Sequence, residues 1–421
     1  MKKILLEGPV LTQSGYGEHT RLVFKSLIQD EGLEIYLNPL SWGSTSWVPP
    51  ENLDLSLSKE IGQAITNFQK YYSTSKNTNK NMSFDIQIHV GIPSEFQKKA
   101  PHSICVTAGI ETDRVSADWL MKTHKGIDRL IVPSEHSKLG FTKTKYEVMN
   151  NHTKEKSILE VNCPVDVIPY PIKNNKVKHL DMNFETEFNF LCIALLGPRK
   201  NMENMVRWFA EEFKDEDVGL ILKTSRANSS LADKEFTINH LRRILPEEER
   251  KCKIYLLHGD LEESELHSLY EREDIHCYVS ATHGEGYGLP LFEAASYGMP
   301  IVATNWSAHL EFLSAPFKEN GKTKNKKLFA KVDFDLKSIP KNAVWKDILV
   351  DGAIWAYPKE SSFKSEIRKV YKNYGMYKKW SETLKDHLHA NYKLENILDL
   401  MHTSICVNDF ANEEELDEVF S

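Results

Sequence analysis

Several common signatures are missing from this chain of 421 residues. Its six cysteines are scattered without a Cys-x-x-Cys pair, which argues against a disulfide framework or a zinc motif and predicts free thiols in a reducing, cytoplasmic setting. No apolar run approaches the ~18 residues of a membrane helix, so we expect no membrane span, while peripheral attachment stays open. Walker loops and Gly-x-Ser-x-Gly are absent too, which disfavours P-loop nucleotide hydrolysis and serine hydrolase chemistry.

An excess of one sign of charge is found in only two stretches of the sequence. The net charge is −7, but residues 408–421 contain six acidic groups and no basic one, which leaves the rest nearly neutral. Residues 316–345 contain eight lysines and three acids. A solvated loop is the simplest interpretation of these lysines, and binding of nucleic-acid phosphates is the alternative.

The remaining composition is that of an ordinary globular protein. Apolar residues make up 41% and charged residues 27% of the chain, and its length predicts two domains. The first half alternates buried strands (3–7, 33–40, 84–90, 103–107, 130–133 and 165–168) with helical stretches, which predicts a parallel α/β sheet. A helix is expected over 17–28, loops are expected at 41–60 and 72–82, and residues 173–187 read as a linker.

The second half repeats the order. Strands are expected at 188–196, 218–223 and 253–257, with helices at 202–213, 237–245 and 261–272, so a second doubly wound domain is expected. Residues 361–400 are helical in pattern.

Residues 283–305 read HGEGYGLPLFEAASYGMPIVATN and are the most informative stretch. We expect a strand at 275–280, a loop to 288, a helix over 289–297 with Pro290 in its first turn, and a strand at 300–304. A glycine loop at the carboxyl end of a parallel strand is a usual nucleotide site, and the helix start that follows favours an anion. Glu285 on the loop and Glu293 one turn into the helix would accept hydrogen bonds from ligand hydroxyls. Solvated glutamates on a plain βαβ unit are the alternative.

This stretch closely resembles the signature EGFGLPLLEAMACGTPVVAS of retaining nucleotide-sugar glycosyltransferases of the GT-B fold, family 4 (group 1) type. The resemblance implies two Rossmann-like domains facing a cleft, with an N-terminal acceptor domain over 1–175 and a donor domain over 185–380. A C-terminal helix at about 380–405 would cross back onto the first domain, before an acidic tail at 406–421. In the family, the first glutamate and the backbone after it hold the donor sugar, and the second glutamate holds the ribose. The resemblance therefore implies that Glu293 holds the ribose. It implies that the donor sugar is held by Glu285 and by the backbone of the residues that follow it, Gly286, Tyr287, Gly288 and Leu289.

Arg199 and Lys200 follow the strand at 188–196, where the resembled family places the basic pair that binds the donor diphosphate. A cation at a helix N-terminus is mildly unfavourable, so an anionic partner explains the pair better than a solvated helix start. The family often has a further arginine where this chain has Leu195, so Arg199 would act alone or with Lys223. Because such cations neutralise the departing diphosphate, the resemblance implies neither metal nor cofactor. Residues 333–335 read Asp-Phe-Asp and resemble a metal motif only superficially.

The N-terminal half supplies further candidates. The loop Ser14-Gly15-Tyr16-Gly17 follows the first strand, and the family's equivalent loop faces the donor phosphates and the acceptor, which makes Gly15 and Gly17 donor candidates and Tyr16 an acceptor candidate. Many members have a histidine near the strand end where this chain has Gly109 and Glu111. Glu111 is therefore a candidate for orienting the acceptor or the sugar, and capping is the structural alternative. His89 ends a strand that could reach the cleft, although a structural histidine is more common there.

These features together predict a retaining hexosyl- or pentosyltransferase that uses a nucleotide-sugar donor, UDP-linked by preference. The expected acceptor is a saccharide or a lipid-linked glycan. Hydroxymethylated pyrimidine in DNA is one alternative, because some GT-B enzymes of bacterial viruses modify DNA, and a non-catalytic nucleotide-sugar-binding module is another. No carboxylate is placed as a nucleophile, which fits the retaining members of the resembled family, and the resemblance implies front-side attack, in which a departing phosphate oxygen takes the acceptor proton.

Overall fold

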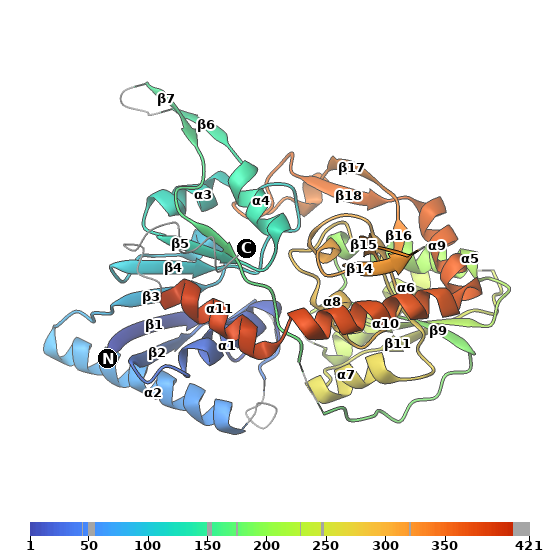
Figure 1. Ribbon diagram of the computed structural model, residues 1–421, viewed down its shortest axis with the longest axis horizontal. Helices are drawn as coiled ribbons and strands as arrows, with labels where there is room; N and C mark the ends of the chain where they lie inside the picture. Colours follow the sequence, from blue (N-terminus) through green and yellow to red (C-terminus); the bar gives the residue numbers. More distant parts are fainter. Residues whose placement is uncertain are drawn as a thin grey trace.

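The computed structural model describes residues 1–43, 45–48, 55–149, 154–173, 176–227, 229–245, 248–319 and 321–406. Two α/β domains stand side by side, each built on a six-stranded parallel sheet (Figure 1). The acidic segment 408–421 lies outside the described residues. Within the described part of the chain, no helix combines the length and the apolar character that a membrane crossing requires.

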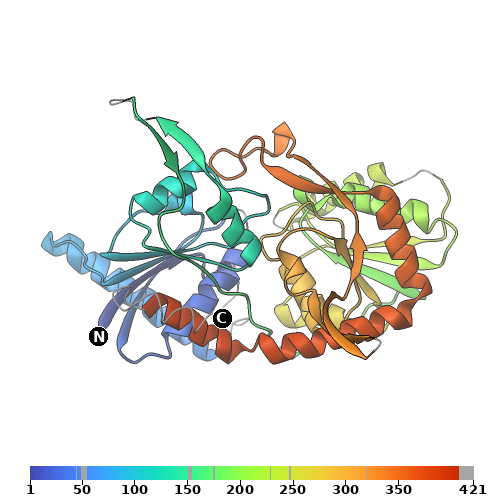
Figure 2. The same ribbon diagram turned by 45° about the horizontal axis from the view of Figure 1, so that its top comes forward.

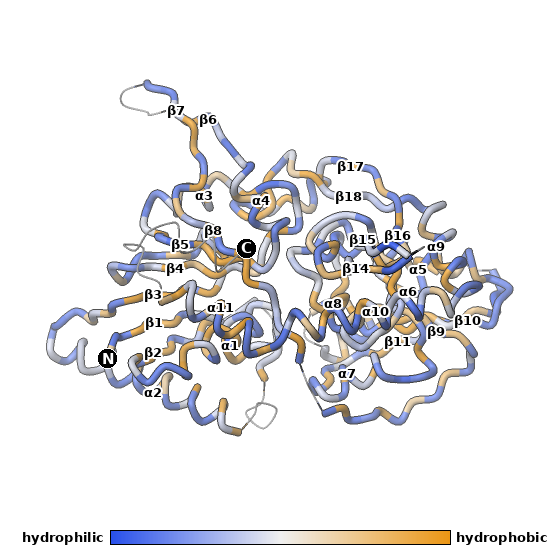
Figure 3. Tube along the Cα trace, in the orientation of Figure 1, coloured by the Kyte–Doolittle hydropathy of each residue, from blue (hydrophilic) through white to orange (hydrophobic). Residues whose placement is uncertain are grey.

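The N-terminal sheet has the strand order β2-β1-β3-β4-β5-β8. Its strands are β1 (Lys2–Gly8), β2 (Leu33–Pro39), β3 (Ile86–Val90), β4 (His102–Val106), β5 (Arg129–Val132) and β8 (Val165–Val167). These confirm the six predicted strands. β1 and β5 contain runs of Ile, Leu and Val because helices cover both faces of such a sheet, and the apolar colour of Figure 3 runs along β3 and β4. The helices are α1 (Gly15–Leu27), α2 (Leu55–Thr78), α3 (Ala117–His124) and α4 (Glu135–Lys143).

The C-terminal sheet has the order β11-β10-β9-β12-β13-β16. Its strands are β9 (Phe188–Ile193), β10 (Val218–Lys223), β11 (Lys253–Leu257), β12 (Cys277–Ser280), β13 (Ile301–Thr304) and β16 (Ala330–Val332). The helices that accompany them are α5 (Met202–Glu212), α6 (Leu231–Ile244), α7 (Glu263–Glu271), α8 (Leu289–Ser296) and α9 (Glu360–Lys372). The fold class expected from the sequence, a pair of doubly wound domains, is therefore correct.

Two final helices connect the domains. α10 (Tyr374–Asn391) lies beside α8, and α11 (Leu394–Cys406) packs against α1 of the N-terminal domain (Figures 1 and 2). Leu388 of α10 and Met401 of α11 are fully buried in one apolar cluster that also contains Leu22 and Phe292. Since burying each such side chain stabilises a fold by about 1.5–3 kcal/mol, this cluster holds the two domains together on the side of α11.

Three expectations about loops were wrong in whole or in part. Residues 55–60, expected within a loop at 41–60, form the beginning of α2. Residues 72–78 belong to α2, because Phe68 and Tyr71 pack beside the cluster around Phe84 and this packing outweighs the Ser/Thr/Asn-rich sequence. The lysine-rich stretch is largely strand, in the hairpin β14 (Ser314–Glu319)–β15 (Lys322–Lys327), in β16 and in β17 (Phe334–Ser338), which pairs with β18 (Ile354–Pro358). A third hairpin, β6 (Tyr146–Met149)–β7 (Lys156–Leu159), projects from the N-terminal domain (Figure 1).

Candidate active site

The glycine-rich signature forms the turn between β12 and α8, as predicted. Gly288 has φ +96°, a backbone conformation that favours glycine, and it precedes the first residue of α8. A side chain at Gly286 would place its Cβ 2.7 Å from the carbonyl oxygen of Ala108. Glycine is needed here because the turn is pressed against the loop that follows β4 in the other domain.

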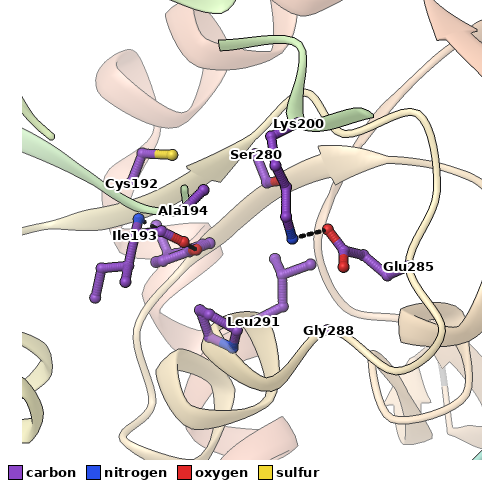
Figure 4. Close-up of a pocket in the computed structure, with 10 residues that line it drawn as sticks. Cys192, Ile193, Ala194, Lys200, Ser280, Glu285, Gly288 and Leu291 are labelled. Atoms are coloured by element: carbon purple, nitrogen blue, oxygen red, sulfur yellow. Dashed lines mark hydrogen bonds and ion pairs between the residues drawn. The ribbon is translucent and has the colours of Figure 1, made fainter. Parts of the chain in front are cut away.

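The carboxylate of Glu285 is buried and paired with two cations. Its Oε2 accepts a hydrogen bond from Arg199 Nη1 at 2.8 Å. Its Oε1 accepts one from Lys200 Nζ at 2.6 Å, and Figure 4 shows this second contact. Burial by itself raises a carboxyl pKa, but the two cations outweigh it and hold the pKa of Glu285 well below its usual range. Burial and the adjacent Arg199 lower the pKa of Lys200, and Glu285 opposes that shift.

Glu111 completes this cluster from the other domain. Its Oε1 lies 3.4 Å from Nη2 of Arg199, so the guanidinium faces two carboxylates at once. The structure thus brings together the four residues that the sequence singled out for catalysis, Glu285, Arg199, Lys200 and Glu111. Each comes from a loop at the carboxyl end of a strand, which is where parallel sheets place ligands.

Ser307 fixes the position of Glu285 and was missed by the sequence analysis. Its Oγ accepts a hydrogen bond from the backbone N–H of Glu285 at 2.9 Å. Its own backbone has φ +83°, a strained conformation for a residue with a side chain. Strain of this kind is common at functional sites, but no local sequence pattern reveals it.

Glu293 lies on α8 in a second, partly buried polar cluster, with its side chain 15% exposed. Its Oε2 accepts a hydrogen bond from Tyr270 Oη of α7 at 2.9 Å. Burial raises the pKa of Glu293 to about 7, although Lys173 and Tyr270 oppose the shift. Lys173 itself pairs with Glu18 of α1 at 2.7 Å. The segment expected to be a simple linker therefore contributes a cation to the interior of the cleft.

The N-terminal glycine loop faces the signature helix. The side chain of Ser14 caps α1 by accepting the N–H of Gly17 at 3.0 Å. A Cβ at Gly15 would lie 4.0 Å from Leu289, the first residue of α8, so the two candidates for donor binding meet across the cleft. Tyr16 turns inward instead, with its Oη 2.8 Å from Thr107 Oγ1.

Three other candidates point elsewhere. The ring of Tyr287 is buried between Phe292 and Phe312, so only its backbone is free to face a ligand. His89 is buried beside Phe96 and not in the cluster around Glu285. Lys223 ends β10, next to β9, but its ammonium donates to the carbonyl of Gly259 at 2.7 Å and not to the cluster around Glu285.

The two domains are in direct contact at the signature turn. The carbonyl of Gly286 accepts hydrogen bonds from the hydroxyls of Ser134 at 2.7 Å and Ser137 at 3.3 Å, and Ser134 is the N-cap residue of α4. The pocket lined by Lys200, Glu285 and Gly288 has a free volume of about 10 Å³ (Figure 4). That is room for about one water molecule, whereas ligand pockets measure about 300–1,000 Å³. All ten residues that line this pocket belong to the C-terminal domain, at the carboxyl ends of β9 and β12 and at the start of α8.

Comparisons with known proteins show which family and which solved structures this chain resembles. Residues 181–323 match the family model described as glycosyl transferases group 1. The chain has the GT-B fold and resembles this family. No curated protein matches it by sequence.

Solved GT-B structures align over most of the chain. Sucrose-phosphate synthase from Thermosynechococcus elongatus has a TM-score of 0.58 at 12% identity, over 95% of this chain and 97% of that one. HepE of Anabaena, solved in complex with UDP and glucose, has a TM-score of 0.53 at 12% identity, over 95% and 98%. TarM of S. aureus has a TM-score of 0.51 at 15% identity over 80% of this chain, which spans only 57% of TarM. At such identities the likeness shows the GT-B fold.

Proposed function

We propose that this GT-B protein transfers a sugar from a nucleoside diphosphate sugar to an acceptor hydroxyl, with retention of the anomeric configuration. The observation that carries the proposal is the buried Glu285 carboxylate, held by Arg199 and Lys200 at the start of α8. Two cations and a helix N-terminus together form a site for a diphosphate. A carboxylate beside them is placed to accept hydrogen bonds from sugar hydroxyls.

Charge development during transfer explains why these groups stand together. When the sugar leaves, negative charge grows on the diphosphate, and preorganised donors in a site closed to water stabilise that charge. Arg199 and Lys200 would take the phosphate oxygens, and Glu285 would keep the sugar in place. Removing one such donor typically lowers turnover about 10²–10³-fold.

Retention is proposed to occur by front-side attack. Glu285 is the buried carboxylate nearest the proposed diphosphate site, and both its oxygens are engaged by cations, which makes it a poor nucleophile. In the proposed step the acceptor oxygen bonds to the anomeric carbon as the bond to the diphosphate breaks. The acceptor proton passes to the departing phosphate oxygen. Glu111, facing Arg199 from the acceptor domain, would orient the acceptor hydroxyl.

The proposal also covers the classes of donor and acceptor. UDP-linked sugars are proposed, supported by HepE, which was solved with UDP and glucose. A saccharide or lipid-linked glycan is proposed as the acceptor. Among the described residues, none of the lysines at 316–345 lines the pocket around Glu285, so no observation favours a DNA acceptor. Because Arg199 and Lys200 supply the positive charge, the reaction is proposed to need no metal.

A nucleotide-release assay tests this function. The protein is incubated with UDP- and GDP-sugars, with and without EDTA, and free nucleoside diphosphate is measured alongside thermal shift. One donor should raise Tm and be slowly hydrolysed, and Lys200→Ala should reduce the Tm increase and lower the hydrolysis rate about 10²–10³-fold. Lys214→Ala is the matched control, because Lys214 pairs with Glu248 on the surface of the same domain. Failure of every nucleotide to raise Tm would reject the donor site and favour a different role for the scaffold.

A further inference from the structure

Three metal-ligating side chains meet where the last helix joins the N-terminal domain. Asp30 follows α1, and His402 and Cys406 lie one turn apart on α11. Oδ2 of Asp30 lies 3.1 Å from Nε2 of His402, and Sγ of Cys406 lies 3.5 Å from the same nitrogen. All three ligand atoms are within 4.8 Å of one another. No sequence motif reveals this group, because Asp30 and His402 are 372 positions apart.

Two of the three separations are close to the edges of a zinc coordination tetrahedron, and the third, between a carboxylate oxygen of Asp30 and Sγ of Cys406, is within 4.8 Å. Zn²⁺ binds sulfur at about 2.3 Å, imidazole nitrogen at about 2.0–2.1 Å and carboxylate oxygen at about 2.0–2.2 Å. Ligand atoms at those lengths and tetrahedral angles are separated by roughly 3.3–3.6 Å. The observed 3.1 Å and 3.5 Å require shifts of only a few tenths of an ångström.

We propose that Asp30, His402 and Cys406 bind one divalent transition-metal ion, Zn²⁺ by preference, with water as the fourth ligand. Thiolate and imidazole ligands select zinc-like ions over Mg²⁺ and Ca²⁺, which prefer oxygen. Without an ion, a single ring nitrogen of His402 faces both the carboxylate and the sulfur, and one proton cannot serve both contacts well. A metal satisfies all three atoms at once.

The surroundings support the site. The backbone N–H of Gly32 donates to Oδ1 of Asp30 at 2.7 Å, which orients the carboxylate and leaves Oδ2 for the metal. The side chains of His402 and Asp30 are 32% and 37% exposed, so an ion and its water can reach them.

The proposed ion would fasten α11 to the end of α1. α11 is the helix that crosses from the C-terminal to the N-terminal domain (Figure 2), and it packs directly on α1. The site lies apart from the cluster around Glu285, and the proposal is independent of the proposed function. Its expected effect is on stability and domain attachment.

Cobalt absorption provides the test. Tag-free, full-length protein is titrated with Co²⁺, and Zn²⁺ is then added as a competitor. One equivalent should bind with a thiolate-to-cobalt charge-transfer band that Zn²⁺ displaces, and Zn²⁺ should raise Tm. Cys406→Ser should lose the band and the Tm increase, and Asp30→Asn should weaken binding at least about tenfold. Cys163→Ser, which alters another partly buried thiol of the same domain, should behave as wild type.

Two results would overturn the proposal. One is Co²⁺ binding by the wild type without a thiolate band, and the other is an unchanged band in Cys406→Ser. Should Cys406→Ser fail to fold, as judged by circular dichroism, His402→Gln takes its place. Undiminished Co²⁺ affinity in folded His402→Gln would reject the site equally.

Discussion

Glu311 of the C-terminal domain accepts a hydrogen bond from the backbone N–H of His136, at the start of α4 in the N-terminal domain, at 3.0 Å. Its second carboxylate oxygen accepts the N–H of Glu135, also at 3.0 Å. A carboxylate from one domain thus satisfies two free N–H groups of a helix in the other, where the helix dipole favours a negative charge. Together with the contact between Ser134 and Gly286, this interaction holds the cleft closed.

Glu311→Ala should shift the protein toward an open arrangement. Loss of a capping carboxylate costs about 0.5–2 kcal/mol, so we expect a larger radius of gyration by X-ray scattering and a raised KM for the donor. Glu319→Ala is the control, because Glu319 is an exposed carboxylate on the β14–β15 hairpin. Unchanged scattering and kinetics in Glu311→Ala would show that the contact does not hold the domains together.

Glu285→Gln should separate binding from turnover. The substitution keeps the shape of the side chain but leaves Arg199 and Lys200 without a counter-charge, and breaking a buried pair costs about 3–5 kcal/mol. The variant should therefore have a lower Tm in the absence of ligand, a larger Tm increase with UDP than wild type, and about 10²–10³-fold lower turnover. Wild-type turnover in this variant would remove Glu285 from the proposed mechanism.

The raised pKa of Glu293 predicts a pH dependence of donor binding. With a pKa of about 7, this carboxyl is largely protonated at pH 6 and largely ionised at pH 8. If the ionised form accepts the ribose hydroxyls, UDP affinity should increase across this range. Calorimetric titrations of wild type and Glu293→Gln, each at several pH values, separate this effect from titration of the nucleotide phosphate. Parallel pH profiles of the two proteins would contradict the assignment.

The same pKa makes a prediction for stability. Since the folded pKa of Glu293 lies above its value of about 4.5 in the unfolded chain, the folded state binds the proton more tightly. Stability is then lost as pH rises from about 4.5 to about 7, by up to about 3 kcal/mol. Urea unfolding should show this decline in wild type and a flatter profile in Glu293→Gln. A decline of equal size in both would assign it to other groups.

Much of this architecture could be predicted because local pattern and tertiary environment agree. Strands buried on both faces are largely apolar, so most strand positions in both sheets were clear from the sequence, whereas β16 lies in the lysine-rich stretch and was not predicted. The signature turn was predictable as well, because its glycines are required by the approach of Ala108 and by the φ of Gly288. The hairpin β14–β15 has an Asn-Gly turn signal at 320–321 in its sequence, but the lysines on either side obscured it.

Contacts between the domains could not be predicted in this way. Ser134 and Glu311 act through partners that lie up to 176 positions away, and no local spacing encodes such pairs. For Tyr287 the sequence suggested a ligand contact that the side chain does not make. It lies within the signature, yet its ring fills the core beside Phe312, so a sequence motif fixes the backbone more reliably than the direction of each side chain.

The most direct test of the central claim is the affinity of UDP for wild type and for Lys200→Ala, measured by titration calorimetry in EDTA. The account predicts metal-independent binding by wild type and a loss of about 1.5–3 kcal/mol on removing the ammonium, because hydrogen bonds to charged groups contribute that much. Equal affinity in the two proteins, or binding only after a divalent metal is added, would contradict a diphosphate site built from Arg199, Lys200 and the start of α8.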